Sequence, residues 1–219
     1  MDEKIEQFML SQMSDSAHDR EHVYRVLYYA LDIAAHEGGA DYAVLTAACL
    51  LHDIGRSAQF ANPALDHAEV GAEMARKWLT DNGYEEAFTE RVCACIRTHR
   101  FRSNAPPQSI EAKILFDADK VDVCGAIGMA RTISYGAHVE RPLYTLSADG
   151  SVSDGTDCRD SVFGEYKFKL EGLYDGFFTE YGSQLAKRRQ VNAVEAYNAL
   201  LSEARDCYAN GKRELERLK

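Results

Sequence analysis

A histidine and an aspartate, His52 and Asp53, directly follow a nearly uninterrupted apolar run over residues 43–51. Such a run is typical of a helix that lies inside a protein rather than on its surface. An ionised side chain at the end of a buried helix costs free energy unless it is paired or binds a metal. The pair therefore predicts an internal ion pair or a metal site, and the fold must bring further polar groups to this helix end.

Apolar residues recur at intervals of three and four over nearly the whole chain, which predicts an all-α helical bundle in a single domain. We expect helices over about 65–82, 85–99, 109–123 and 160–183, and a last one over about 184–217. Asp41 is expected to cap the helix that contains the apolar run. Residues 138–157 are rich in Gly, Ser and Asp and predict a long loop without a packed element. We expect this loop to be the most mobile segment and to border the functional site.

Two further polar residues lie on apolar helix faces. His22 shares a face with Val26 and Ile33, and Asp119 shares a face with Leu115. Three inward-facing helices would therefore each bring a ligand to one centre. Two imidazoles and two carboxylates suit a divalent metal ion such as Mn, Mg, Fe, Co, Ni or Zn.

These residues stand in ordered motifs: His-Asp-Arg-Glu-His-Val (18–23), Leu-Leu-His-Asp-Ile-Gly (50–55), Asp-Ala-Asp-Lys-Val-Asp (117–122) and Gly-Ala-Ile-Gly-Met-Ala-Arg (125–131). The set resembles the HD-domain superfamily of metal-dependent phosphohydrolases, and in particular its small stand-alone bacterial members. The resemblance implies one HD-type domain over 1–219, with a metal-binding core over about 16–136 and C-terminal helices over about 160–217. It also implies that His22, His52, Asp53 and Asp119 bind the metal.

The last aspartate of the set has alternatives. Asp117 and Asp119 project about 200° apart on a helix, so both cannot reach one ion. Asp119 and Asp122 share a side, and the resemblance favours Asp119. Asp122 is the second choice as a ligand, or it orients a ligand or water. For Asp117 we expect a structural hydrogen bond or ion pair.

His67 and His99 match histidines of related HD proteins and are expected to act in catalysis with Asp53. Asp53 or Asp122 could accept a proton from water, and His67 or His99 could protonate the leaving oxygen. The two histidines could instead hold a second metal, as in the di-iron members of the superfamily. We favour one essential metal, because nothing in the sequence requires a second.

The expected reaction is hydrolysis of a small phosphate ester or anhydride, with a nucleotide as the substrate. A bound metal would lower the pKa of water and polarise a phosphoryl oxygen. Cationic side chains would stabilise the charge that develops on the phosphoryl group. The residues expected at the substrate are Arg56, Arg100, Lys120, Asp122 and Arg131.

The chain of 219 residues has a net charge of −10, which argues against binding to a nucleic acid polymer. It has no apolar run of roughly 18–20 residues that could cross a membrane, and its acidic start is unlike a secretory leader. A cytoplasmic enzyme is therefore expected, and no oligomeric state follows from the sequence. Two alternatives remain: a di-iron HD-type oxygenase, and a non-catalytic nucleotide-binding regulatory protein.

Overall fold

The structure is a computed structural model that describes residues 3–13, 20–100 and 106–219. These residues form helices and no β-strand, apart from one isolated bridge between Leu146 and Val152. The predicted all-α fold is confirmed. His18 and Asp19, at the start of the first sequence motif, lie outside the described residues.

The chain divides into two compact units, which are described separately. The first contains residues up to Asp122 together with 177–182, and the second contains 123–176 and 183–219. The assignment of the whole chain to one HD-type domain stays a prediction. Every residue that the sequence predicts as a metal ligand lies in the first unit, so this unit carries the candidate site.

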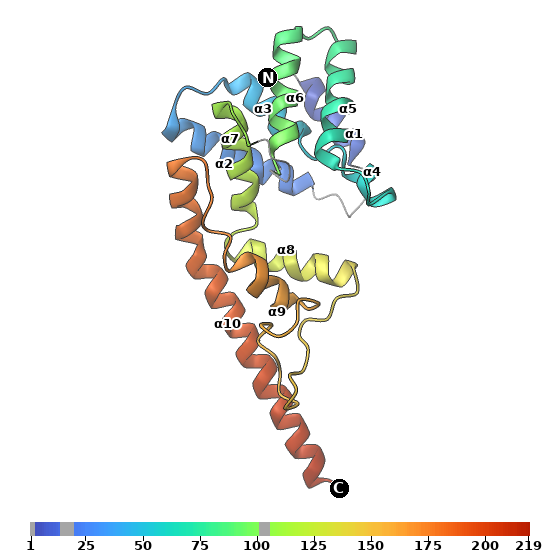
Figure 1. Ribbon diagram of the computed structural model, residues 1–219, viewed down its shortest axis with the longest axis vertical. Coiled ribbons are helices and arrows are strands. Elements are labelled where there is room, and N and C mark those ends of the chain that lie inside the picture. The colour runs from blue at the N-terminus through green and yellow to red at the C-terminus, as the bar shows by residue number, and fades with distance from the viewer. Residues whose placement is uncertain (1–2, 14–19, 101–105) are drawn as a thin grey trace. The chain divides into compact units, whose positions relative to one another are not determined.

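The first unit is built around one buried helix. Its helices are α1 (Glu3–Gln12), α2 (Arg20–Glu37), α3 (Tyr42–Leu51), α4 (Arg56–Ala61), α5 (His67–Asp81), α6 (Glu86–Thr98) and α7 (Ile110–Asp122) (Figure 1). Helix α3 packs against α1, α2, α5, α6 and α7. Each residue from Val44 to Leu51 is buried, because this stretch has no charged side chain on any face. The carboxylate of Asp41 accepts hydrogen bonds from the backbone N–H groups of Ala43 and Val44, so the predicted cap is confirmed.

The turn after α3 lies directly against the start of α5. A Cβ atom added to Gly55 would lie 2.3 Å from the backbone oxygen of His67 and 2.6 Å from the backbone nitrogen of Gly71. Gly55 has an ordinary φ of −82°, so a glycine is needed here for space and not for an unusual backbone conformation. This close approach places the His52–Asp53 turn beside His67.

The second unit has its own apolar core. Its helices are α8 (Gly125–His138), α9 (Val162–Glu165), a π-helix (Tyr166–Leu170) and most of α10 (Glu180–Arg217), whose first residues belong to the first unit. The rings of Tyr166 and Tyr197 stack at 4.1 Å between centroids, and Phe163 meets Tyr197 edge to face. Met129 and Leu170 complete the same buried cluster.

The single helix expected over 160–183 is not formed. The helical segments end at Leu170, and Gly176 has a φ of 85°, a conformation that favours glycine and interrupts a helix. Helix α10 begins only after Thr179, whose hydroxyl accepts a hydrogen bond from the backbone N–H of Gly182. The sequence pattern therefore predicted helical residues here but missed the break between them.

The loop after α8 is more closely packed than its composition predicted. Val152 belongs to the apolar core of the second unit, and the backbone N–H of Ser153 donates to the carbonyl of Thr145. The hydroxyl of Ser147 donates to the carboxylate of Asp157 at 2.9 Å. The predicted long loop is confirmed, because residues 139–157 form no helix or strand apart from the isolated bridge between Leu146 and Val152, but the loop contributes to the core through Val152. Its mobility and its place at the border of the site stay predictions.

No helix within the described ranges is both long enough and apolar enough to cross a membrane.

Candidate metal centre

Three helices of the first unit bring His22, His52 and Asp119 together. His22 comes from α2, His52 directly follows α3, and Asp119 comes from α7. The Nε2 atom of His22 lies 3.1 Å from Oδ1 of Asp119 and 3.4 Å from Nε2 of His52. One nitrogen or oxygen atom from each residue lies within 4.8 Å of the others, a spacing that could hold a metal ion. We call these three residues the first group.

A second group of the same kind consists of Asp53, His67 and His99. The Oδ1 atom of Asp53 lies 3.3 Å from Nε2 of His67 and 3.6 Å from Nε2 of His99. All three residues are buried. The structure therefore presents two places for a metal ion, whereas the sequence favoured one.

Asp53 lies between the two groups. Its Oδ1 atom faces His67 and His99, while its Oδ2 atom lies 3.7 Å from Nε2 of His22 and 3.7 Å from Nε2 of His52. A carboxylate with one oxygen toward each group can bridge two ions. The ring centroid of His52 lies 5.3 Å from that of His22 and 5.2 Å from that of His99.

Each of the four histidines uses its Nδ1 atom for a contact that leads away from the centre. His52 meets the carbonyl of Cys49 at 2.7 Å, and His99 meets the carbonyl of Ile96 at 2.6 Å. A carbonyl only accepts, so Nδ1 carries the proton in both rings and Nε2 has the lone pair that a metal needs.

The other two histidines meet side chains in the same way. His22 meets Oδ2 of Asp122 at 2.7 Å, and His67 meets Oε1 of Gln59 at 2.7 Å. Asp122 is itself held by Arg25, whose Nε donates to its Oδ1 at 2.7 Å. Acceptors of this kind orient a histidine and raise its basicity as a metal ligand.

The donor set fits a divalent metal. The Nε2 atoms of His67 and His99 are buried and have no hydrogen-bond partner. A buried polar atom without a partner costs free energy, and a bound cation would remove this cost. Imidazole and carboxylate ligands are the types that Mn, Fe, Co, Ni and Zn accept.

The ionisation of the site also suits a cation. Burial lowers the pKa of His52 and of His67 to about 4, so both rings are neutral near pH 7. Burial acts to raise the pKa of Asp53, but the charge of Arg56 and the contacts with His67 and His99 outweigh it and hold the pKa well below its usual value. At Asp119 the hydrogen bond and charge of His22 likewise outweigh burial and lower the pKa. Neutral imidazoles and ionised carboxylates are the forms that bind metals.

Comparison with known proteins assigns the chain to a family. The HD domain profile matches residues 20–124, which contain both groups. The uncharacterized protein YpgQ of Bacillus subtilis is 30% identical to the chain over 196 residues, which cover 85% of each protein. The chain belongs to the HD-domain family.

Solved structures of HD-domain proteins have the same fold. A predicted HD superfamily hydrolase from an uncultured Thermotogales bacterium is 29% identical, with a TM-score of 0.62 over 92% of this chain and 91% of that one. An HD-superfamily hydrolase from Bacillus thuringiensis is 27% identical, with a TM-score of 0.69 over 92% and 95% of the two chains. YpgQ in complex with ADP superposes with a TM-score of 0.72 at 24% identity, over 92% and 93%. These relatives support membership of a hydrolase family.

Asp117 and Asp119 have different surroundings in this HD-domain protein. Asp117 is buried and accepts hydrogen bonds from the backbone N–H groups of Phe178 and Thr179, at 3.0 and 2.7 Å, and from the Thr179 hydroxyl at 2.6 Å. It thereby holds the residues that precede α10. Asp119, on the other side of α7, lies with the first group, as the helical spacing led us to expect.

Two of the arginines expected at the substrate lie beside the second group. The Nε atom of Arg56 donates to Oδ1 of Asp53 at 3.0 Å, and its side chain is 32% exposed. The Nη1 atom of Arg100 lies 3.0 Å from Nδ1 of His67. Both cations are therefore close to the place where a phosphoryl group would meet a metal.

The other predicted substrate residues are placed differently. Lys120 lies over the rings of Phe116 and Phe177, at 5.7 and 4.6 Å from their centroids, and not with either group. Asp122 is fully buried, with its oxygens on His22 and Arg25, so it orients the ring of His22. Arg131 lies on α8 in the second unit, and its role stays a prediction.

The catalytic roles of His67 and His99 stay predictions. Both Nε2 atoms point to Asp53, where they could bind a metal, and both Nδ1 atoms are already in contact with acceptors. Burial lowers the pKa of His67 to about 4, so its ring is neutral near pH 7 and its remaining proton lies on Nδ1, toward Gln59. The position of both rings suits the alternative of a second metal.

Sequence reasoning missed two residues of the centre, Arg25 and Gln59. Arg25 lies three residues after His22, on the same side of α2, so helical spacing could have indicated it. Gln59 lies on the short helix α4, which carries no apolar periodicity, and its contact with His67 depends on the close approach at Gly55. No pattern in the sequence could have indicated Gln59.

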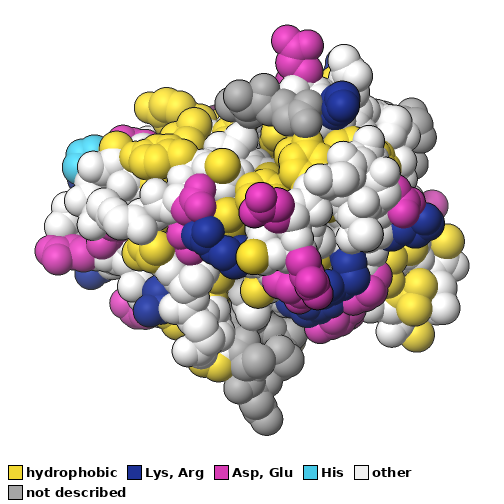
Figure 2. Space-filling model, turned by 90° about the horizontal axis from the view of Figure 1, so that it is seen from above, with side chains coloured by type: hydrophobic (Ala, Val, Ile, Leu, Met, Phe, Trp, Pro, Cys, Tyr) yellow, Lys and Arg dark blue, Asp and Glu magenta, His cyan; other side chains and the backbone are white. Residues whose placement is uncertain are grey.

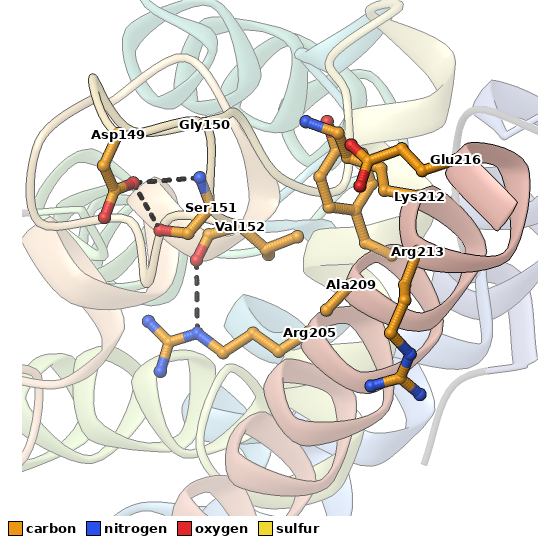
Figure 3. A pocket seen from close by; sticks show the side chains of 10 residues that line it. Asp149, Gly150, Ser151, Val152, Arg205, Ala209, Lys212, Arg213 and Glu216 are labelled. Atoms are coloured by element: carbon orange, nitrogen blue, oxygen red, sulfur yellow. Dashed lines mark hydrogen bonds between the residues drawn. The ribbon is translucent and has the colours of Figure 1, made fainter.

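A separate hollow of about 330 Å³ lies in the second unit (Figure 3). The turn at Gly150 and Ser151 forms one side, and α10 forms the other through Arg205 and Lys212. The Nε atom of Arg205 donates to the carbonyl of Val152 at 3.1 Å across it. No residue of the two groups lines this hollow.

Proposed function

We propose that this HD-domain protein is a divalent-metal-dependent phosphohydrolase that binds two metal ions and acts on a small phosphate ester or anhydride, specifically a nucleotide. The observation that carries the proposal is the arrangement of two ligand groups that share Asp53. Two adjacent ions are a common device for hydrolysis of phosphate bonds.

The metal ions, when bound, would supply a water of lowered pKa and polarise a phosphoryl oxygen. The chain contributes the positions and the charges around them. His22 and His52 are held by Asp122 and the carbonyl of Cys49, so their Nε2 atoms stay directed into the first group, where they would hold an ion. Arg56 and Arg100 place positive charge beside Asp53 and His67, where it would stabilise charge on the phosphoryl group.

Three observations favour a small nucleotide over a polymer. YpgQ, the relative that is 30% identical, has a crystal structure in complex with ADP. The net charge of −10 disfavours contact with an extended phosphate backbone. On the face drawn in Figure 2, the described Lys and Arg side chains lie beside Asp and Glu side chains and form no continuous basic surface.

The test is a screen of nucleoside mono-, di- and triphosphates and simple phosphate esters with Mn²⁺, Mg²⁺, Co²⁺ and Ni²⁺, with released phosphate and pyrophosphate as the readout. We expect hydrolysis of at least one nucleotide and its loss in His52→Ala and Asp119→Asn. His36→Ala is the control, because His36 is an exposed histidine that stacks on Tyr181 and belongs to neither group. Absence of any metal-dependent release would contradict the proposal.

A di-iron oxygenase is the second candidate, because the same six side chains form two groups with histidine and carboxylate ligands. Two groups of this kind could also hold two iron ions. Protein loaded with Fe²⁺ would then consume O₂ in the presence of a substrate, which the phosphohydrolase would not do. Measurement of O₂ uptake beside phosphate release therefore separates the two functions.

A further inference from the structure

Gln59 is held in one orientation by two hydrogen bonds of its side-chain amide. Its Nε2 donates to the backbone carbonyl of Leu65 at 2.8 Å, and its Oε1 lies 2.7 Å from Nδ1 of His67. An amide nitrogen only donates and a carbonyl only accepts, so the Leu65 bond fixes which end of the amide is which. The end that faces His67 is therefore the oxygen.

The orientation of Gln59 determines the tautomer of His67. An amide oxygen only accepts, so Nδ1 of His67 must carry the proton and Nε2 must carry the lone pair. That Nε2 atom is buried, has no hydrogen-bond partner and lies 3.3 Å from Oδ1 of Asp53. The amide thus keeps the lone pair of His67 directed into the second group.

A second neighbour favours the opposite tautomer. Arg100 lies with Nη1 3.0 Å from the same Nδ1 atom, and a guanidinium only donates. A bond from Arg100 to Nδ1 would move the ring proton to Nε2, which could then donate to Asp53 but could not bind a metal. Gln59 and Arg100 therefore favour opposite tautomers of the same ring, and Gln59 makes the shorter contact with Nδ1.

We propose that Gln59 is a positioning residue that selects the metal-binding tautomer of His67 and so determines the affinity of the second group for its ion. The inference rests on the proposed pair of metal ions. The first group contains no contact with Gln59, so its affinity would not depend on this residue. Loss of such a partner typically weakens metal binding about 10- to 100-fold.

Two substitutions separate this role from a merely structural one. Gln59→Met removes both hydrogen bonds of the amide. Gln59→Glu keeps an oxygen that accepts from His67 but replaces the group that donates to Leu65. If Gln59 mattered only through Leu65, both variants would behave alike. If it acts on His67, only the methionine variant loses affinity at the second group.

Gln108→Met is the matched control. Gln108 is an exposed glutamine that donates to the carbonyl of Pro106 and contacts neither group.

The experiment is equilibrium dialysis of the full chain against increasing Mn²⁺, with bound metal measured by elemental analysis and folding followed by thermal melting. We expect two ions in wild type, Gln108→Met and Gln59→Glu. In Gln59→Met we expect one ion of unchanged affinity and a second bound about 10- to 100-fold more weakly.

The outcomes are distinguishable. A wild-type protein that binds one ion at saturation would contradict the two-metal proposal itself. Two ions of unchanged affinity in Gln59→Met would overturn only the role of Gln59. Equal losses in Gln59→Met and Gln59→Glu, or weakening of both ions together, would also overturn it, because the effect would then come from the Leu65 contact or from the fold.

Discussion

Gly55 lies directly against the backbone of His67, so that a Cβ atom at Gly55 would come within 2.3 Å of the His67 carbonyl oxygen. This contact joins the turn after α3, which carries His52 and Asp53, to the first residue of α5. The second group depends on it, because Asp53 lies in that turn and His67 lies in α5.

The substitution Gly55→Ala should therefore damage the second group. The added methyl group would push α5 away from Asp53 and cost about 1–3 kcal/mol of unfolding free energy, as in other overpacked sites. We expect a lower melting temperature and loss of one of two bound Mn²⁺ ions. Gly172→Ala is the control, because nothing lies within 4 Å of its added Cβ. Two ions of normal affinity in Gly55→Ala would contradict the predicted dependence.

Asp117 and Asp119 should have separable roles. Asp119→Asn should lose metal and activity, since a neutral amide is a weaker ligand than a carboxylate. Asp117→Asn should keep metal but lose stability on the order of 1–3 kcal/mol, because Asp117 accepts three hydrogen bonds at the start of α10. Elemental analysis and urea denaturation of both variants test this. Loss of metal in Asp117→Asn alone would show that the wrong aspartate is assigned.

Arg25 should support metal binding without touching the metal. Its Nε and Nη2 atoms donate to the two oxygens of Asp122, at 2.7 and 3.1 Å, and Asp122 orients His22. Arg25→Met should therefore weaken binding of Mn²⁺ to the first group by about 10-fold. Arg20→Met should have no such effect, since Arg20 is an exposed residue of the same helix that pairs with Glu21. Metal titration of both variants measures these affinities, and equal affinities would contradict the predicted role of Arg25.

The stability of the metal-free protein should fall on acidification well before its carboxylates titrate. Burial lowers the pKa of His52 and His67 to about 4, whereas an unfolded histidine titrates near about 6.5. The unfolded chain therefore binds more protons between these values, so this stability is complete above about pH 6.5 and is lost as the pH falls toward about 4. Between about pH 7 and pH 5 the loss is on the order of 2 kcal/mol for each histidine.

Urea denaturation of chelator-treated protein at several pH values measures this dependence. His52→Gln and His67→Gln should each flatten the profile, because each removes one of the two titrating rings. A profile of wild type that stays flat over this range would contradict the lowered pKa values.

Local sequence pattern predicted the first group but not the second. His22 and Asp119 lie on apolar faces of long, regular helices, and such faces point inward wherever the helix is packed. The second group depends on contacts between segments distant in sequence, above all the approach of Gly55 to His67. The spacing of residues along the sequence does not indicate that approach. The same limit explains why a structural role was predicted for Asp117 but its partner was not, since Thr179 lies 62 residues away.

The helix break near Gly176 shows a second limit of periodicity. The residues on either side repeat as a helix would, and a glycine inside a helical pattern is tolerated. Only the positive φ of Gly176 and the hydrogen bonds that the backbone N–H groups of Phe178 and Thr179 donate to Asp117 end one segment and begin the next.

Because Asp53 presents one oxygen to each group, the two metal ions would not bind independently. An ion in the first group would draw on the charge of a carboxylate that the second group also needs, and it would at the same time fix that carboxylate in place. Thermodynamic linkage requires this influence to be mutual. The first ion changes the affinity for the second by the same factor as the second changes the affinity for the first. Occupancy of one group would therefore change the affinity of the other, while the affinity of the first group in the absence of a second ion would depend on its own residues alone.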